Sequence, residues 1–249
     1  MKIGLVPMSA KPYHIGHHKL IDIAAKENDV TFVFVSFSSR GVKKIKDPTD
    51  KRTIKQGARK IEVPKDGELP IFGSDMRYIW LNILKEELEF SGRVELVFPK
   101  EGKSLIPVLS VHEACASLIE SIDNNAWFEI DGQKFESSSS TIQIYSDKQD
   151  IATNYDNQTM TKYYKDDWFR HITLVGVDRN DTVNISGTKM RALLSERKNI
   201  DEFKSLLPPI RNNSKNIVAE ILFDSAGSGT TFNSRCVRAI QTPLPIYAG

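Results

Sequence analysis

The first 25 residues constrain the fold of this chain more than any other stretch. Ile3, Leu5 and Val6 form a short apolar run that is typical of a buried strand, and Pro7 is expected to end it. After His17, apolar residues recur at helical spacing. The turn between strand and helix should place free backbone N–H groups and the positive end of the helix dipole at a sheet edge. The stretch therefore predicts a phosphate-binding turn.

The turn contains the sequence His14-Ile15-Gly16-His17. Two imidazoles three positions apart at the start of a helix can both turn toward one bound anion. Gly16 has no side chain, so a nucleotide can approach the backbone closely there. The alternative interpretation is a surface loop with two exposed histidines.

A second stretch, residues 184–194, follows the apolar strand predicted at 172–177. Ser186 is placed as the N-cap of a helix whose buried face holds Met190, Leu193 and Leu194. One interpretation is a capped helix and nothing more. The other is a second phosphate cradle, in which Ser186 and Thr188 meet phosphate oxygens and Arg191 reaches back with its guanidinium fork.

Residues 8–17 resemble the (T/H)-x-G-H signature of the nucleotidyltransferase superfamily, and residues 185–191 resemble its second motif, I-S-x-T-x-x-R. The second motif is similar to that of adenylyl-transferring members, such as nicotinamide mononucleotide adenylyltransferases and ATP sulfurylases. The Arg-Thr-x-Gly-Ile-Ser-Thr-Thr form of cytidylyl-transferring members is absent. Ala10 stands where the superfamily usually has phenylalanine, and Lys11 where it has an acidic or amide residue.

The resemblance implies an enzyme that transfers AMP from ATP to a phosphorylated acceptor and releases pyrophosphate. Nicotinamide mononucleotide is the best candidate for the acceptor, which would place the chain in NAD biosynthesis. Mg²⁺ is expected to be bound through the nucleotide phosphates, with no metal site formed by protein side chains. The implied catalytic residues are His14, His17, Lys11 and Arg191. The implied nucleotide-binding residues are Met8, Ser9, Ala10, Gly16, Asp147, Ser186, Gly187 and Thr188.

Two other functions deserve comparison. Class I aminoacyl-tRNA synthetases share His-Ile-Gly-His, but their Lys-Met-Ser-Lys-Ser signature is missing here. The non-enzyme alternative is a nucleotidyltransferase-like domain that serves as an assembly or interaction module through its C-terminal arm.

The fold class follows from a second buried strand at residues 29–36. Strand, helix and strand form a βαβ unit with a right-handed crossover. With further strands at 93–98, 141–145 and 172–177, the sequence predicts a Rossmann-like open parallel sheet of about five strands with helices on both faces. Ligands bind beyond the carboxyl ends of such strands. Ser36, Ser38 and Arg40 are therefore expected to face the same cleft as the two histidines, unless they form an ordinary polar loop.

We expect a nucleotidyltransferase domain at residues 1–223 and an extended arm, rich in Gly, Ser, Thr and Pro, at 224–249. Residues 40–68 form a basic insertion or flap, with ten Lys or Arg against three acids between positions 40 and 65, a net of +7. The insertion lacks the aromatic residues needed for base stacking, so a role in steering phosphorylated substrates is favoured over nucleic-acid binding. Residues 99–140 form a helix and hairpin insertion.

Several smaller features complete the sequence-based expectations. Ser74 is expected to cap a helix, and another helix is expected at 107–122 with His112 at the surface. A hairpin with an Asp-Gly turn is expected at 127–135, and a last helix at 215–222. Asp147 borders the adenosine if the resemblance holds; otherwise it is an ordinary strand-end residue. The aromatic residues between 163 and 169 either stack on the acceptor or pack a connecting segment.

Charge and apolar pattern set the remaining expectations. The formal net charge is +2, and no apolar run is long enough for a membrane span or a signal peptide. Cys115 and Cys236 have no metal-ligand spacing. We therefore expect a cytoplasmic protein that binds ATP and a small phosphorylated acceptor, and a homo-oligomer with the C-terminal arm as a candidate contact.

Overall fold

A computed structural model describes residues 1–37, 51–56, 59–64, 71–100, 105–124, 126–130, 132–136, 140–164, 167–178, 183 and 185–228. The chain divides into two compact units. Unit 1 comprises Met1–Phe37 and Glu89–Ile185, and unit 2 comprises Ser38–Leu88 and Ser186–Gly249.

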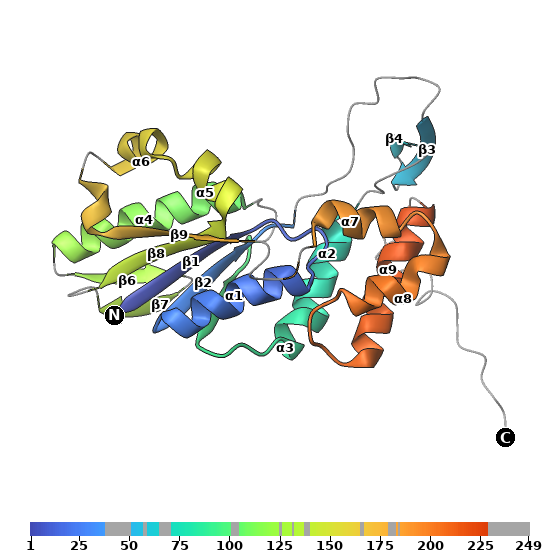
Figure 1. Cartoon of the computed structure of the whole chain (residues 1–249), viewed down its shortest axis with the longest axis horizontal. Helices are drawn as coiled ribbons and strands as arrows, with labels where there is room; N and C mark the ends of the chain where they lie inside the picture. Colours follow the sequence, from blue (N-terminus) through green and yellow to red (C-terminus); the bar gives the residue numbers. More distant parts are fainter. Residues whose placement is uncertain are drawn as a thin grey trace. The chain divides into compact units, whose positions relative to one another are not determined.

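Unit 1 is built on a five-stranded sheet in which every neighbouring pair of strands is parallel (Figure 1). Its strand order is β5-β2-β1-β8-β9. The strands are β1 (Lys2–Met8), β2 (Val30–Val35), β5 (Val94–Val97), β8 (Thr141–Asp147) and β9 (Ile172–Val177). The sheet confirms the predicted Rossmann-like fold class.

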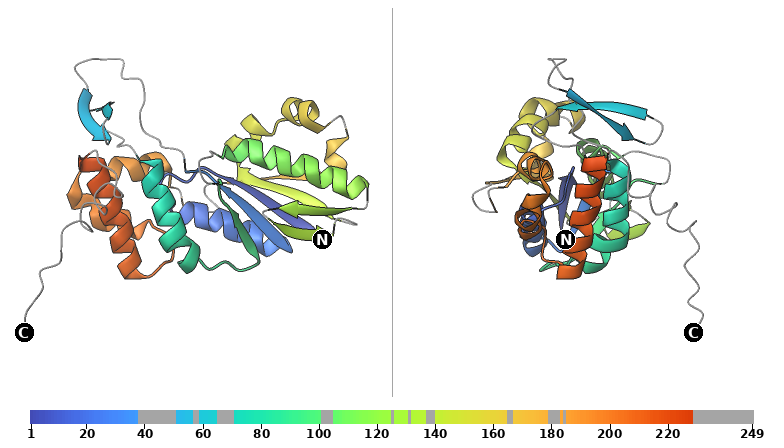
Figure 2. Two further views of the ribbon diagram at one scale, coloured as in Figure 1. Left: turned by 180° about the vertical axis from the view of Figure 1, so that it is seen from behind. Right: turned by 90° about the vertical axis from the view of Figure 1, so that its right-hand side faces the viewer.

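Helices cover both faces of this sheet (Figure 2). The chain moves outward from β1 through β2 to β5, then returns past β1 to β8 and β9. Because parallel crossovers are right-handed, this reversal places the connecting helices on opposite faces. Helix α1 (Ile15–Glu27) lies on one face, and α4 (Pro107–Asp123), α5 (Lys148–Asn154) and α6 (Asn157–Tyr164) lie on the other.

The core of unit 1 lies between the sheet and helices α4 and α6. Strand β2 is buried along its whole length, as expected for a central strand of a parallel sheet with both faces covered. The core includes Ile3, Leu5, Phe32, Phe34, Val111, Leu118, Ile142, Ile144 and Met160.

Pro7 does not end the first strand, which continues to Met8. Pro7 lacks a backbone N–H and would interrupt a ladder in the middle of a sheet. Successive residues of β1 direct their backbone groups alternately toward β2 and β8, and the carbonyl oxygen of Met8 accepts from the backbone nitrogen of Ser36 after β2. The backbone nitrogen of Pro7 is therefore directed toward β8, and pairing with β8 stops at Leu5. The missing N–H costs no hydrogen bond there.

His112 is buried, contrary to the prediction that it lies at the surface. Its residue is 3% exposed, and Nδ1 lies 2.6 Å from the Tyr164 hydroxyl. The Tyr163 ring stacks on the imidazole at a centroid distance of 4.2 Å. Burial lowers the pKa of His112. These contacts fasten α6 to α4, so Tyr163 and Tyr164 are occupied in packing, one of the two alternatives open for this aromatic segment.

The structure refines two other expectations in unit 1. The hairpin predicted at 127–135 is formed by β6 (Trp127–Ile130) and β7 (Gln133–Glu136), and Gly132 adopts a φ of +81° at its turn. The left-handed region explains why glycine stands there. Helix α1 begins at Ile15 rather than after His17.

Unit 2 contains a continuous helical segment of mixed α and π character and a group of C-terminal helices. The segment runs through α2 (Gly73–Ile79), the π-helical η1 (Trp80–Leu84) and α3 (Lys85–Glu87). Ser74 is not its N-cap, because the helix begins at Gly73 and Phe72 occupies the cap position without a side-chain hydrogen bond. Helices α7 (Gly187–Leu193), α8 (Ile200–Ser205) and α9 (Asn212–Ser228) follow along the chain.

Helix α9 extends beyond both predicted ends of the last helix. Residues 224–228, assigned to the C-terminal arm, belong to α9, and residues 229–249 lie outside the described part of the chain.

The basic segment contains a two-stranded antiparallel sheet that was not predicted from the sequence. Strands β3 (Lys51–Gln56) and β4 (Arg59–Pro64) pair with Ile54 opposite Ile61. The other residues of the predicted insertion at 40–68 lie outside the described part of the chain. Among the residues that the structure describes, no helix combines the length and apolar character that crossing a membrane requires.

Candidate functional site

The predicted phosphate-binding turn connects the carboxyl end of β1 to the start of α1. Met8 and Ala10 are buried within it, whereas Ser9 is exposed. Lys11 is 6% exposed, so its side chain does not extend into solvent. The turn therefore lies at the sheet edge where open parallel sheets bind ligands.

His14 and His17 form a reciprocal cap at the N-terminus of α1. His14 is the N-cap residue, and its Nδ1 accepts a 3.4 Å hydrogen bond from the backbone nitrogen of His17. The Nδ1 atom of His17 accepts in return from the backbone nitrogen of His14, also at 3.4 Å. An accepting Nδ1 places the proton of a neutral imidazole on Nε2. Both rings are therefore set to donate from Nε2.

The two imidazoles stack directly on each other. Their centroids are 3.6 Å apart, and the rings are 22° from parallel. His14 is 3% exposed, whereas His17 is half-buried. Stacking and capping fix the orientation of both rings before any ligand binds, which is the preorganisation that charge stabilisation requires.

Gly16 makes this close packing possible. A Cβ atom at position 16 would lie 3.1 Å from Cε1 and Nδ1 of His14 and 3.2 Å from Cγ2 of Ile185. These distances are shorter than ordinary van der Waals contacts. Glycine therefore leaves the space that the His14 ring occupies and keeps the backbone of the first helical turn open.

Tyr13 and His18, which were not predicted from the sequence as site residues, support the turn. The Tyr13 ring stacks on His17 at a centroid distance of 5.8 Å, and its hydroxyl lies 3.4 Å from Nδ1 of His18. Burial lowers the pKa of His18, although Asp22 opposes that shift. The doublet His17-His18 is the sequence signal that could have predicted this support, since adjacent helical residues face different directions.

Asp147 and Ser36 lie at the same sheet edge as the turn. Strands β1 and β8 pair through Leu5 and Ile144, so Met8 and Asp147 each lie three residues beyond the last pair. Ser36 follows β2, and its backbone nitrogen hydrogen-bonds to Met8 at 3.0 Å. The other two residues expected at this cleft, 38 and 40, lie outside the described part of the chain.

Asp147 lines a pocket of about 250 Å³. Its lining comes from the carboxyl ends of β8 and β9 and the start of α5: Asp147, Lys148, Gln149, Val177 and Asp178. Oδ1 of Asp147 accepts from the backbone nitrogen of Asp150 at 2.9 Å, which makes Asp147 the N-cap of α5. Lys148 and Asp178 form an ion pair at 3.0 Å.

The second motif forms the start of α7 in unit 2. Ser186 is the N-cap, as predicted, and its hydroxyl accepts from the backbone nitrogen of Lys189 at 3.2 Å. Arg191 is 5% exposed and reaches back one turn, where Nη2 donates to the Thr188 hydroxyl at 3.1 Å. Met190 and Leu194 are buried, whereas Leu193 is half-buried. Gly187 is the first residue of the helix.

The structure thus brings the predicted residues of the first motif and Asp147 to one edge of unit 1, and it groups those of the second motif on α7. Within the described residues, no group of three or more His, Cys, Asp or Glu side chains is arranged to hold a metal ion. Comparisons of the chain with protein-family models and with curated proteins found no match.

Proposed function

We propose that the chain is an adenylyltransferase that transfers AMP from ATP to a phosphorylated acceptor, with nicotinamide mononucleotide as the best candidate. The observation that carries the proposal is the stacked, mutually capped pair His14 and His17 beside Gly16. Helix α1 also has no acidic residue in its first turn, so its N-terminus suits a polyanion. The resemblance of both motifs to the nucleotidyltransferase superfamily points to the same reaction.

In the proposed reaction, an oxygen of the acceptor phosphate attacks the α-phosphorus of ATP. A new P–O bond forms, the bond from the α-phosphorus to the bridging oxygen breaks, and pyrophosphate leaves with that electron pair. His14 and His17 donate hydrogen bonds to the α- and β-phosphates as negative charge develops there, and Lys11 adds a positive charge. Catalysis then consists of positioning and charge stabilisation without a covalent enzyme intermediate.

The polar side chains of the turn are cationic or hydrogen-bond donors, and none is a carboxylate. They fit a nucleotide whose phosphates hold Mg²⁺, and the ion would neutralise phosphate charge. We propose that Met8, Ser9, Ala10 and Gly16 approach the nucleotide through their backbones, and that Asp147 contacts the ribose or base. Cytoplasmic localisation and a homo-oligomeric assembly stay predictions.

The resemblance also assigns residues of α7 to the β- and γ-phosphates. The residues concerned are Ser186, Gly187, Thr188 and Arg191. This assignment stays a prediction, and variants such as Arg191→Lys test it through the affinity for ATP.

The test is pyrophosphate release from Mg-ATP across a panel of phosphorylated acceptors that begins with nicotinamide mononucleotide, with CTP as the nucleotide control. We expect His17→Ala to lower turnover by at least about a hundredfold, roughly 2.7 kcal/mol. His171→Ala is the matched control, because His171 lies at the opposite end of the sheet, just before β9.

Near-normal turnover of His17→Ala would remove the histidine pair from the mechanism. Failure of the wild-type protein to bind ATP or release pyrophosphate with any acceptor would refute the proposed reaction itself.

A further inference from the structure

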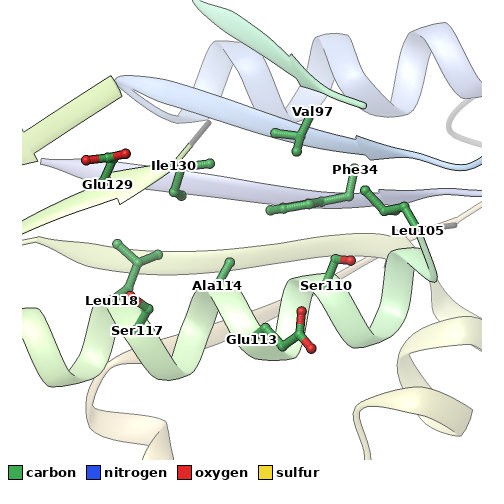
Figure 3. A pocket seen from close by; sticks show the side chains of 10 residues that line it. All are labelled: Phe34, Val97, Leu105, Ser110, Glu113, Ala114, Ser117, Leu118, Glu129 and Ile130. Atoms are coloured by element: carbon green, nitrogen blue, oxygen red, sulfur yellow. The ribbon is translucent and has the colours of Figure 1, made fainter. Parts of the chain in front are cut away.

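Unit 1 contains a second pocket, of about 310 Å³, on the face of the sheet that α4 covers (Figure 3). Helix α1 and its histidine pair belong to the other face (Figure 2). The pocket is lined by Phe34, Val97, Leu105, Ser110, Glu113, Ala114, Ser117, Leu118, Glu129 and Ile130. None of these residues belongs to the proposed nucleotide site.

The pocket exists because α4 presents small side chains beside a short edge strand. Ser110, Ala114 and Ser117 recur at the i, i+4 and i+7 positions of α4 and lie on the same side of it. Strand β5 is at the edge of the sheet and has four residues. The lining residues of α4, from Ser110 to Leu118, extend along about 12 Å of helix. Six of the ten side chains that line the space are apolar.

The apolar walls and the volume are typical of a small-molecule site. Phe34 and Leu118 are buried, and Val97 is half-buried. Ligand pockets commonly have volumes of about 300–1,000 Å³ and apolar walls with a few polar groups that orient the ligand. The polar groups here are two serine hydroxyls and two carboxylates.

Both charged residues of the lining are acidic. Glu113 comes from α4 and Glu129 from β6, and Figure 3 shows them on different sides of the apolar side chains. Neither carboxylate has an ion pair or a hydrogen bond within the described part of the chain. Lys134 stands opposite Glu129 in the β6–β7 register but does not line the pocket. The lining therefore repels anions and attracts cations.

We propose that this pocket binds a small aliphatic diamine. The methylene chain would lie against Phe34, Val97 and Leu118, and removal of this apolar surface from water favours binding. One ammonium group would pair with Glu113 and the other with Glu129. The two carboxylates on separate elements, with apolar side chains between them, favour a dication over a single amine.

Isothermal titration of the full-length protein with 1,5-diaminopentane tests the proposal. We expect saturable binding at one site, which weakens as salt is added. The neutral analogue 1,5-pentanediol should bind at least about tenfold more weakly, because it lacks both charges. The monoamine 1-aminopentane should have an intermediate affinity.

The variants Glu113→Gln and Glu129→Gln should each weaken diamine binding about tenfold. Both side chains belong to exposed residues, so their replacement should leave folding intact. Glu89→Gln is the matched control, because Glu89 is exposed in the same unit and does not line the pocket. Ala114→Leu should abolish binding by filling the pocket, with circular dichroism as the check of its fold.

Three results would overturn the proposal. The first is no binding of 1,5-diaminopentane at millimolar concentration. The second is equal binding of the diamine and the diol. The third is unchanged affinity in both glutamine variants. ATP binding, measured in parallel, reports on the histidine turn and separates failure of the diamine proposal from failure of the adenylyltransferase proposal.

Discussion

Glu87 is the residue whose replacement should affect unit 2 most clearly. Its carboxylate accepts hydrogen bonds from the backbone nitrogen of Arg211 at 3.0 Å, from Nη2 of Arg211 at 2.5 Å and from the Ser214 hydroxyl at 2.5 Å. These groups lie just before and in the first turn of α9, so the carboxylate also meets the positive end of that helix dipole. Glu87 therefore joins the end of α3 to the start of α9.

The hydrogen bond from the Arg211 guanidinium, assisted by Ser214 and the Arg211 backbone, lowers the pKa of Glu87 from 4.5 to about 2 despite partial desolvation. A shift of that size corresponds to a ceiling of about 3.4 kcal/mol. The Arg211 side chain is 79% exposed, so solvent screens its share. We expect Glu87→Gln to lower the free energy of unfolding of unit 2 by about 2 kcal/mol at pH 7.

The pH dependence gives the sign of the effect. The pKa of Glu87 is lower in the folded state, so its stabilisation is present above pH 4.5 and is lost as the pH falls toward 2. The difference between wild type and Glu87→Gln should therefore shrink at pH 3 to less than about half its value at pH 7.

Urea denaturation followed by Trp80 fluorescence measures this difference. Trp80 is buried in unit 2, and replacing the other tryptophans, Trp127 and Trp168, with phenylalanine leaves it as the only reporter. Glu86→Gln is the matched control, because this neighbour in α3 is exposed. A stability loss below about 0.5 kcal/mol at pH 7, or one as large at pH 3 as at pH 7, would refute the role of the Glu87 charge.

Three further predictions concern unit 1. Gly92→Ala should lower the free energy of unfolding, measured by urea denaturation, by about 3 kcal/mol, because its Cβ would lie 2.1 Å from a backbone carbonyl oxygen at the end of α1. A loss below about 1 kcal/mol would contradict the close packing of Gly92 against α1. Gly16→Ala should change the free energy of unfolding by less than about 1 kcal/mol, because the higher helix propensity of alanine offsets crowding against His14. The same variant should lower the affinity for ATP, measured by titration calorimetry, at least tenfold. Unchanged affinity would show that the nucleotide does not approach this backbone. In a Cys236→Ser background, Cys115 should resist a thiol reagent at pH 8 until urea is added, because burial raises its pKa to about 12; rapid labelling of the folded protein would contradict its burial.

The sheet was predictable from sequence because its strands are short apolar runs separated by helical periodicity. The βαβ unit of residues 2–35 fixes parallel pairing, and the handedness of crossovers then places helices on both faces. The signal for the β3–β4 pair was also present. In the sequence, the segments of β3 and β4 are separated by only two residues, the first of which is Gly57. Such a short connection with a glycine is typical of a hairpin. The high charge of the segment obscured this pattern.

The remaining differences arise from tertiary contacts that a local pattern does not contain. His112, a polar side chain, was predicted to lie at the surface, but Tyr164 and the carbonyl oxygen of Asn154, more than 40 positions away, satisfy its ring nitrogens. Pro7 continues a strand because β8 stops pairing before it. At the candidate site, the sequence placed His14 and His17 at the start of a helix. It did not predict their stacking, which depends on side-chain orientation.

The order of the strands also matters while the chain is being synthesised. Strand β1 lies at the centre of the sheet, and its neighbours are β2, which follows soon after it, and β8, which begins at Thr141. A ribosome adds about 5–20 residues per second, so the 106 positions from Val35 to Thr141 take roughly 5 to 20 s. During that interval one edge of β1 lacks its native partner. The nascent β1–α1–β2 segment would then present an unpaired strand edge. A chaperone would have most effect on the yield of folded protein during this interval.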